Sequence, residues 1–327
     1  MSSALNKVKV AAPATVANLV CGFDVLGMAL NEPSDIMEIC FNDAGSIRIS
    51  HTDGYDLPTD PEKNVAGAAL LALMAEMGED KRGFDLSITK NIKPGSGLGS
   101  SAASSAGAVA AANMLLGNRF DEYALVRFAM NGEKVASGVK HADNITPCLL
   151  GGVTLIRAIH PLDIVQLDAP PLFVTVVHPQ IEVRTSDARQ ILRKEVQLKN
   201  AIKQWGNIAG LVAGFLQHDY GLIGRSLEDV IIEPVRSILI PGFDEVKKRC
   251  TEAGALGGGI SGSGPSIFML NKEEGTAREV EKIMQGELLD LKLISKTDIK
   301  NQSPANPALK KYFYHGTSHL LGLDVHD

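Results

Sequence analysis

The chain has 327 residues, 45% of them hydrophobic and 21% charged, a composition that is ordinary for globular proteins and suits roughly two domains of about 100–200 residues. The formal net charge of −6 and the lack of a long basic run argue against a nucleic-acid partner, and no apolar run is long enough to cross a membrane. The N-terminus lacks the charged-then-apolar order of a signal peptide, so we expect a cytoplasmic protein. The cysteines match no metal-binding spacing, and we expect free, mostly buried thiols at Cys21, Cys40, Cys148 and Cys250.

The first half of the chain predicts a mixture of strands and helices. A strand is expected at 8–12, and Pro13 begins a loop with unusual backbone demands that contains Asn18, Gly22 and Asp24. Apolar periodicity then predicts strands at 35–42, 46–52, 83–92 and 151–159, and helices at 64–78, 101–117 and 121–137.

The second half opens after the proline pair at 170–171 with a β-branched strand at 172–179. Further along the chain, the patterns predict helices at 186–196, 204–219, 241–254 and 274–288, and a strand at 265–270. This order favours an antiparallel sheet with helices on one face. We therefore expect an α+β fold with two domains, a mixed α/β domain at 1–166 and an α+β sandwich at 167–327.

A loop rich in glycine and serine joins the strand at 83–92 to the small-residue helix at 101–117. Glycines permit positive φ, and the free N–H groups at a helix start attract anions, so the loop is a candidate phosphate site. It has neither the Walker pattern GxxxxGK[ST] nor the dinucleotide pattern GxGxxG, although Asp121 and Glu122 lie near the distance expected of a ribose-binding acid. These residues alone support phosphate binding and plain turn chemistry equally, and they leave a dinucleotide site open.

A second segment, at 254–264, has six glycines in eleven positions. It lies between an expected helix and an expected strand, so a flexible linker is disfavoured and a close backbone approach is expected. Two such segments are stronger evidence for a ligand site than one.

Three segments resemble the three sequence motifs of the GHMP kinases, in the same order and with similar spacing: APATVANLVCGFDVLGMAL at 12–30, PGSGLGSSAASSAG at 94–107 and GALGGGISGSGPS at 254–266. GEKVASGVKHADN at 132–144, TSDAR at 185–189 and EPVR at 233–236 are most similar to the members that phosphorylate homoserine. The resemblance covers nearly the whole chain. It implies a two-domain GHMP kinase fold, ATP- and Mg²⁺-dependent transfer of a phosphoryl group to the γ-hydroxyl of L-homoserine, and commonly a homodimer.

The resemblance also implies which residues bind the nucleotide and the metal. The ATP phosphates would be wrapped by Pro94, Gly95, Ser96, Gly97, Leu98, Gly99, Ser100, Ser101, Ala102 and Ala103. Asn64 and Val65 would lie near the adenine. Ser101 and Glu133 would be catalytic as Mg²⁺ ligands, because this cation takes few protein oxygens besides phosphate and water. Without the resemblance, Ser101 would be a helix cap and Glu133 a solvated helix residue.

The substrate residues implied by the resemblance are Asn18, Asp24, His141, Asp143, Asn144, Thr185, Arg189, Arg236 and Gly259. A zwitterion needs a carboxylate for its ammonium, here Asp24, and arginines for its own carboxylate, here Arg189 and Arg236. Asn144 cannot accept a proton, so we expect it to orient the hydroxyl while Mg²⁺ and the loop amides carry the catalysis.

Several alternatives remain open at this stage. Loop capping by Asn18 and Asp24, a structural role for His141 and helix capping by Thr185 are each reasonable. A mevalonate-type GHMP kinase would need no partner for an ammonium, so Asp24 argues against it. A dinucleotide-dependent oxidoreductase and a noncatalytic nucleotide-binding member complete the alternatives.

Overall fold

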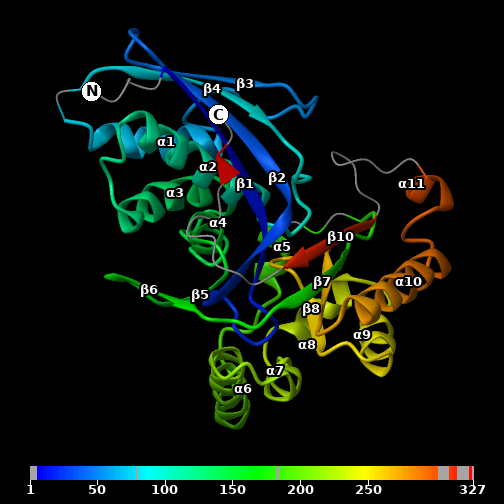
Figure 1. Ribbon diagram of the computed structural model, residues 1–327. Coiled ribbons are helices and arrows are strands. Elements are labelled where there is room, and N and C mark those ends of the chain that lie inside the picture. Colours follow the sequence, from blue (N-terminus) through cyan, green and yellow to red (C-terminus); the bar gives the residue numbers. More distant parts are fainter. Residues whose placement is uncertain are drawn as a thin grey trace.

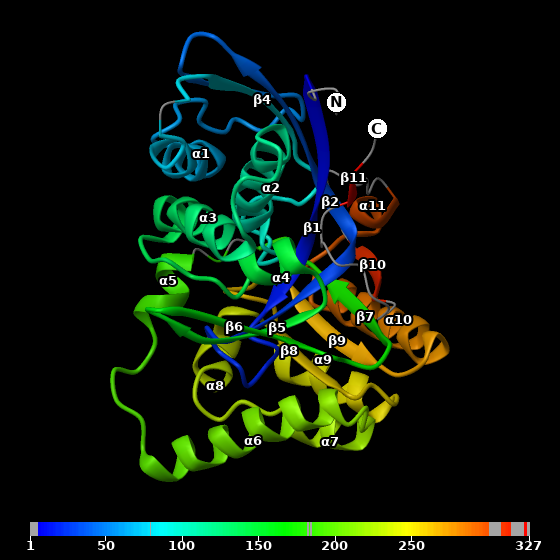
Figure 2. The same ribbon diagram turned by 60° about the vertical axis from the view of Figure 1, so that its left-hand side comes forward.

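The structure is a computed structural model that describes residues 6–78, 80–181, 183, 185–300, 309–314 and 324–325. Two β-sheets, of seven and four strands, form its framework (Figure 1). A view turned by 60° shows α1, α2 and α3 beside the larger sheet and α9 and α10 beside the smaller sheet (Figure 2). Within the described residues, no helix is both long and apolar enough to span a membrane.

The larger sheet contains most strands of the first half. Its strands are β1 (Lys7–Ala17), β2 (Leu26–Asn42), β3 (Ile47–His51), β4 (Gly83–Thr89), β5 (Val153–Ile159), β6 (Leu162–Leu167) and β11 (Asp324–Val325). The order is β11-β1-β2-β4-β3, with β5 and β6 attached to one end of the long β2. Most neighbours are antiparallel, and β3 pairs parallel with β4, so the sheet is mixed.

Helices α1 (Val65–Ala75), α2 (Ser100–Leu115) and α3 (Glu122–Ser137) lie on one side of this sheet (Figure 1). Almost all of α2 is buried, because its alanines, serines and glycine let it approach the strands closely. At Gly107, an added Cβ would come within 2.8 Å of Met37 and 2.9 Å of Ala12, so a larger residue would push α2 off the sheet. The tightly packed helix expected after the glycine loop is confirmed.

The smaller sheet is antiparallel, in the order β10-β7-β9-β8. Its strands are β7 (Leu172–Val177), β8 (Gly257–Ile260), β9 (Ile267–Asn271) and β10 (Leu309–Tyr314). Along β9, Phe268 and Leu270 join the core shared with the first half, whereas Ile267 and Met269 pack into a second core. The second core includes residues of α9 (Phe243–Glu252) and α10 (Glu274–Asp290). The expected antiparallel sheet with helices on one face is therefore confirmed.

Shorter helices and one more long helix complete the second half and the link to it. They are α4 (Ile145–Leu150), α5 (Thr185–Gln190), α6 (Leu198–Leu216), α7 (Tyr220–Ser226), α8 (Glu233–Arg236), the 3₁₀ turn η1 (Ser237–Leu239) and α11 (Lys296–Lys300). The expected domain boundary between 166 and 167 stays a prediction. All four cysteines are free, and Cys40 alone among them is partly exposed, as expected.

Three local expectations were wrong, and some short elements were not expected. β1 continues past Pro13 to Ala17 and stays paired with β2. Pro13 lies opposite Ser34 and Thr15 lies opposite Ala29, so the extra residues between these two pairs bulge from β2 and not from β1. The glycine-rich segment at 254–264 is a strand over 257–260 rather than loop throughout. The helix expected at 186–196 ends at Gln190, since the apolar residues that follow join neither core. Helix α4 was not expected at all, because its six residues are too few to show a period.

Candidate active site

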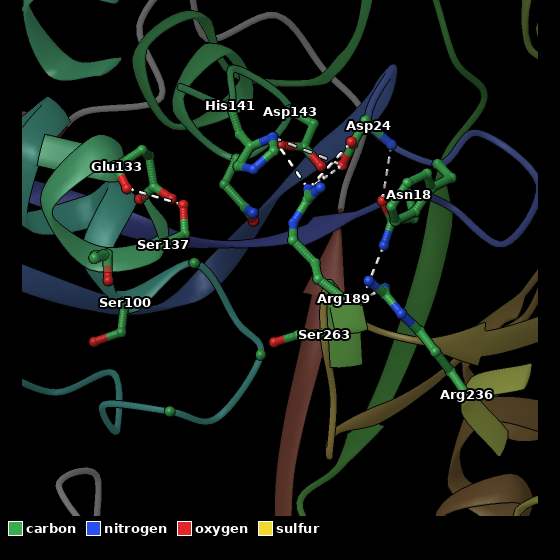
Figure 3. A pocket seen from close by; sticks show the side chains of 18 residues that line it. Asn18, Asp24, Ser100, Glu133, Ser137, His141, Asp143, Arg189, Arg236 and Ser263 are labelled. Atoms are coloured by element: carbon green, nitrogen blue, oxygen red, sulfur yellow. Dashed lines mark hydrogen bonds and ion pairs between the residues drawn. The ribbon is translucent and has the colours of Figure 1, made fainter. Parts of the chain in front are cut away.

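A cavity of about 290 Å³ lies where the two halves meet (Figure 3). Its walls come from the loop after β1, the loop before α2, the end of α3, the start of α4, the short helices α5 and α8, and the turn after β8. The lining residues are Asn18, Phe23, Asp24, Gly95, Gly97, Gly99, Ser100, Ser101, Glu133, Ala136, Ser137, His141, Asp143, Asn144, Arg189, Arg236, Gly262 and Ser263. Segments far apart in sequence thus form one polar cavity.

The two glycine-rich segments meet at this cavity. Gly95, Gly97 and Gly99 have φ values of 73°, 81° and 69°, in the left-handed region that favours glycine. The Ser261 hydroxyl donates to the Gly97 carbonyl at 2.7 Å, and the Ser266 amide donates to the Ser96 carbonyl at 3.3 Å. The expected close backbone approach of the second segment is confirmed, and its target is the first segment.

Helix α2 begins at the cavity without a side-chain cap. Its N-cap residue is Gly99, which has no side chain to satisfy the first N–H groups of the helix. Free amides and the positive end of the helix dipole therefore border the cavity. A phosphate group is well suited to this position.

Ser101 and Ser100 differ in the state of their hydroxyl groups. The Ser100 hydroxyl donates to the Ile92 carbonyl at 2.9 Å. The Ser101 hydroxyl has no hydrogen-bond partner within the described part of the chain, and Ser101 lines the cavity together with Glu133. Of the two serines, Ser101 is the one free to bind a ligand.

Glu133 lies at the cavity end of α3 and is only partly exposed. Burial, and secondarily the charge of Asp143, raises the pKa of the Glu133 carboxyl to about 7. A carboxylate with few neighbouring donors and a free hydroxyl are both hard oxygen ligands, so the pair fits Mg²⁺ shared with a nucleotide phosphate.

A charged pocket lies at the opposite end of the cavity (Figure 3). The Arg189 Nη2 group donates to both carboxylate oxygens of Asp24, at 3.0 and 3.1 Å. It also lies 3.3 Å from His141 Nδ1. Burial lowers the pKa of His141, which keeps the imidazole neutral at physiological pH. Among the described residues, His141 Nε2 and Arg189 Nε are buried side-chain atoms without a hydrogen-bond partner.

Asn18 holds the backbone of this pocket in place. Both Asn18 and Asp24 adopt positive φ, 74° and 61°, which asparagine and aspartate tolerate better than most residues. The Asn18 side chain accepts from the Asp24 amide at 3.1 Å and donates to the Gly262 carbonyl at 2.9 Å. Asn18 therefore has the loop-capping role that the sequence left open as an alternative. The Asp24 carboxylate does not cap the loop and instead faces Arg189.

Arg236 is a second cation in the pocket, and it is only 4% exposed. It donates to the carbonyls of Ala188 at 3.1 Å and Gly262 at 3.0 Å. The guanidinium carbons of Arg236 and Arg189 lie 4.9 and 5.6 Å from the centre of the Phe23 ring. Burial, and then the charge of Arg189, lowers the pKa of Arg236 to about 10, so Arg236 is cationic at neutral pH.

Asp143 and Asn144 precede α4, between the charged pocket and the phosphate loop. Asp143 is 4% exposed, and burial together with the charge of Asp24 raises its pKa to about 7. The Asn144 Oδ1 atom accepts a hydrogen bond of 2.6 Å from the hydroxyl of Thr15.

Comparison with known proteins agrees with this geometry. The model of the GHMP kinases N terminal domain matches residues 64–152, and that of the GHMP kinases C terminal matches residues 211–289. Homoserine kinase of Chloroherpeton thalassium is 49% identical over 286 residues, covering 84% of this chain and 90% of the relative. This chain belongs to the homoserine kinase family.

Other members of the homoserine kinase family support the same assignment. Homoserine kinase of Pyrococcus abyssi is 40% identical over 87% of this chain and 94% of the relative. The crystal structure of homoserine kinase from Cytophaga hutchinsonii has a TM-score of 0.87 and 44% identity, covering 100% of this chain and 99% of that chain. The L. major mevalonate kinase in complex with R-mevalonate, at 16% identity and a TM-score of 0.66, shares the fold alone.

Some residues that the family resemblance suggested lie outside the cavity. Pro94, Ser96, Leu98, Ala102, Ala103, Asn64, Val65 and Gly259 do not line it, and the side chain of Thr185 is outside the described residues. Asn64 caps α1, accepting from the amides of Ala66 and Gly67 at 2.9 and 3.2 Å. Gly259 lies within β8, where an added Cβ would clash with the Glu233 carboxylate, so its environment is one of packing.

The cavity also contains residues that we did not predict individually. Phe23, Ala136, Ser137, Gly262 and Ser263 all lie within motifs that the sequence pointed to. Thr15 lies in the first of these motifs, but the sequence offers no sign that its hydroxyl contacts a residue 129 positions away.

Proposed function

We propose that this chain transfers the γ-phosphoryl group of ATP to the γ-hydroxyl of L-homoserine, giving O-phospho-L-homoserine for threonine biosynthesis. One observation carries the proposal: a single cavity joins an uncapped glycine-rich phosphate loop to a pocket that holds a carboxylate and two arginines. Homoserine is a small zwitterion with a hydroxyl. Its ammonium group is complementary to the carboxylate of the pocket, and its carboxylate is complementary to the arginines. Membership of the homoserine kinase family supports the same substrate.

The charges support one orientation of the substrate. The Asp24 carboxylate is the anion available to the ammonium group, and Arg189 and Arg236 are the cations available to the α-carboxylate. Because Asn144 lies on the way to the phosphate loop, a hydroxyl on the side chain of the bound amino acid would extend toward it. His141 Nε2 offers a further polar contact at the charged end.

The other end of the cavity supports nucleotide binding with Mg²⁺. Ser101 and Glu133 would hold the metal, which supplies charge neutralisation to the phosphates when bound. The amides at the start of α2 would hold phosphate oxygens. In a loose phosphoryl-transfer transition state the nucleophile is barely bonded, so positioning and neutralised charge matter more than a strong base.

The assay is ADP release from Mg-ATP by the purified protein, with L-homoserine, L-serine, mevalonate or no acceptor added. Release that requires homoserine is expected. Release with mevalonate instead would discard the zwitterion pocket, and equal release without acceptor would reject phosphoryl transfer to an amino acid. The homodimer and the cytoplasmic location expected from the sequence stay predictions, and light scattering of the purified protein tests the first.

A further inference from the structure

We propose that Thr15 is a positioning residue for the transfer: its buried hydroxyl fixes the orientation of the Asn144 side-chain amide, at the junction between the phosphate loop and the substrate pocket. This inference rests on the proposed function, to which it adds a residue with no direct contact to substrate. It concerns the contact between Thr15 Oγ1 and Asn144 Oδ1, 2.6 Å apart.

The backbone of β1 delivers Thr15 to this position. Thr15 follows the point at which the pairing with β2 shifts register, and its amide donates to the Leu98 carbonyl at 3.1 Å instead of to the sheet. The residue is completely buried, so its hydroxyl has no access to solvent. A threonine is thereby attached through its backbone to the phosphate loop and through its side chain to Asn144.

The hydrogen bond decides which end of the Asn144 amide faces the cavity. An amide oxygen only accepts hydrogen bonds, so the Thr15 hydroxyl is the donor in this pair. The Asn144 Nδ2 group has no partner within the described part of the chain, and Asn144 lines the cavity with its side chain partly exposed. The amide therefore presents its N–H donors to the ligand, where one of them can hold the hydroxyl oxygen of the acceptor.

Gly99 makes the junction compact. An added Cβ at Gly99 would clash with the Thr15 hydroxyl and would lie 3.0 Å from Asn144 Oδ1. Gly99, the N-cap of α2, therefore packs directly against Thr15 and Asn144. The amides that would hold phosphate and the side-chain amide that would hold the acceptor hydroxyl are thus fixed relative to each other. An error of about 1 Å at such a point can cost about 100-fold in rate.

The test compares Thr15→Val, which removes the hydroxyl at nearly constant volume, with Thr15→Ser, which keeps it. Thr15→Ala is a second hydroxyl-free variant in case the new methyl group disturbs Gly99. Thr154→Val is the matched control, because it breaks another buried hydroxyl pair, 2.7 Å long, between Thr146 in α4 and β5. Each variant is assayed for kcat and for the KM of homoserine and ATP, alone and combined with Asn144→Ala.

We expect the hydroxyl-free variants to lose about 10- to 100-fold in kcat with little change in either KM, and Thr15→Ser to restore most of the rate. We expect no further loss when they are combined with Asn144→Ala, because Thr15 acts through that side chain. A wild-type kcat in both hydroxyl-free variants, multiplied losses in the double variants, or an equal loss in Thr154→Val would overturn the proposal.

A second measurement needs no acceptor. In protein labelled with ¹⁵N-asparagine, the Asn144 side-chain amide signal is identified by its loss in Asn144→Ala. Thr15→Val should shift this signal, whereas Thr15→Ser and Thr154→Val should leave it in place; an unmoved signal in Thr15→Val refutes the hydrogen bond. If wild-type protein fails to turn over homoserine, the proposed function falls, and this signal still decides the role of Thr15.

Discussion

Replacement of Gly97 by alanine tests how firmly the second glycine-rich segment supports the phosphate loop. An added Cβ at Gly97 would come within 2.6 Å of the Ser261 carbonyl oxygen and 2.8 Å of the Gly264 carbonyl oxygen. Both neighbours are backbone atoms, so they cannot rotate away as a flexible side chain would. Gly95 offers a matched control, because it has a similar positive φ of 73° but nothing within 4 Å of an added Cβ.

Both substitutions place alanine in a left-handed backbone conformation, and only the one at Gly97 also causes a steric clash. Alanine in the left-handed region costs about 1–2 kcal/mol at either position. At Gly97 the turn must also move, which would break the bonds from Ser261 and Ser266 to the loop, at about 1 kcal/mol each. We therefore expect Gly97→Ala to lower the free energy of unfolding by about 3–4 kcal/mol, against about 1–2 kcal/mol for Gly95→Ala.

Urea unfolding followed by circular dichroism measures the difference in stability, and steady-state kinetics measure the KM of Mg-ATP. Gly97→Ala should raise that KM more than Gly95→Ala, since only the first displaces the loop from the turn that holds it. Equal stability losses in the two variants would refute the reasoning, because the contact between the segments would then contribute nothing measurable.

Three further predictions concern polar and charged residues of the cavity. Asp24→Ala should raise the KM of homoserine far more than that of ATP, and a matched rise in both would reveal a structural role. Asn144→Asp should keep some activity and make kcat depend on pH in a new way; a folded variant that binds both ligands but turns over at no pH would contradict hydroxyl orientation. The pKa of Glu133 rises from 4.5 to about 7 on folding, so its contribution to the free energy of unfolding falls as pH rises between these values. Urea titrations of ligand-free Glu133→Gln should lack that part of the fall, and a pH profile identical to wild type would show that the carboxyl is not perturbed.

Local patterns in the sequence predicted much of the fold. The alternation of Phe84, Leu86 and Ile88 with polar residues marks β4, and the run of small residues after Gly99 marks α2, because both patterns report on the immediate backbone. The strand order and the contact between the glycine-rich segments could not be predicted in this way. They depend on how the two halves pack, and a pattern of period two or 3.6 carries no information about that.

For the site too, the sequence predicted some features and not others. Motifs brought Asp24, Glu133, Asn144 and Arg189 into consideration, and the cavity contains all four. The residue types did not reveal which of their atoms are already occupied. Asn64, which the family resemblance placed near the adenine, has its side-chain oxygen engaged as the N-cap of α1. The Asn144 side-chain oxygen, by contrast, is occupied by the hydroxyl of Thr15, 129 positions away, and a bond of this kind forms only when the chain has folded.

The ion pair between Asp24 and Arg189 has a consequence for selectivity. In the ligand-free pocket these two groups satisfy each other, so a ligand must separate them before it can use either. A zwitterion would replace this ion pair with two new ones, because its ammonium group pairs with Asp24 and its carboxylate pairs with Arg189. Neither residue is then left without a partner. An amino alcohol without a carboxylate, or a hydroxy acid without an amine, would pair with one of the two groups and leave the other charge unpaired in a partly buried position, which is unfavourable. With the proposed substrate, we therefore expect the pocket to select against ligands that carry only one of the two charges, without any steric barrier.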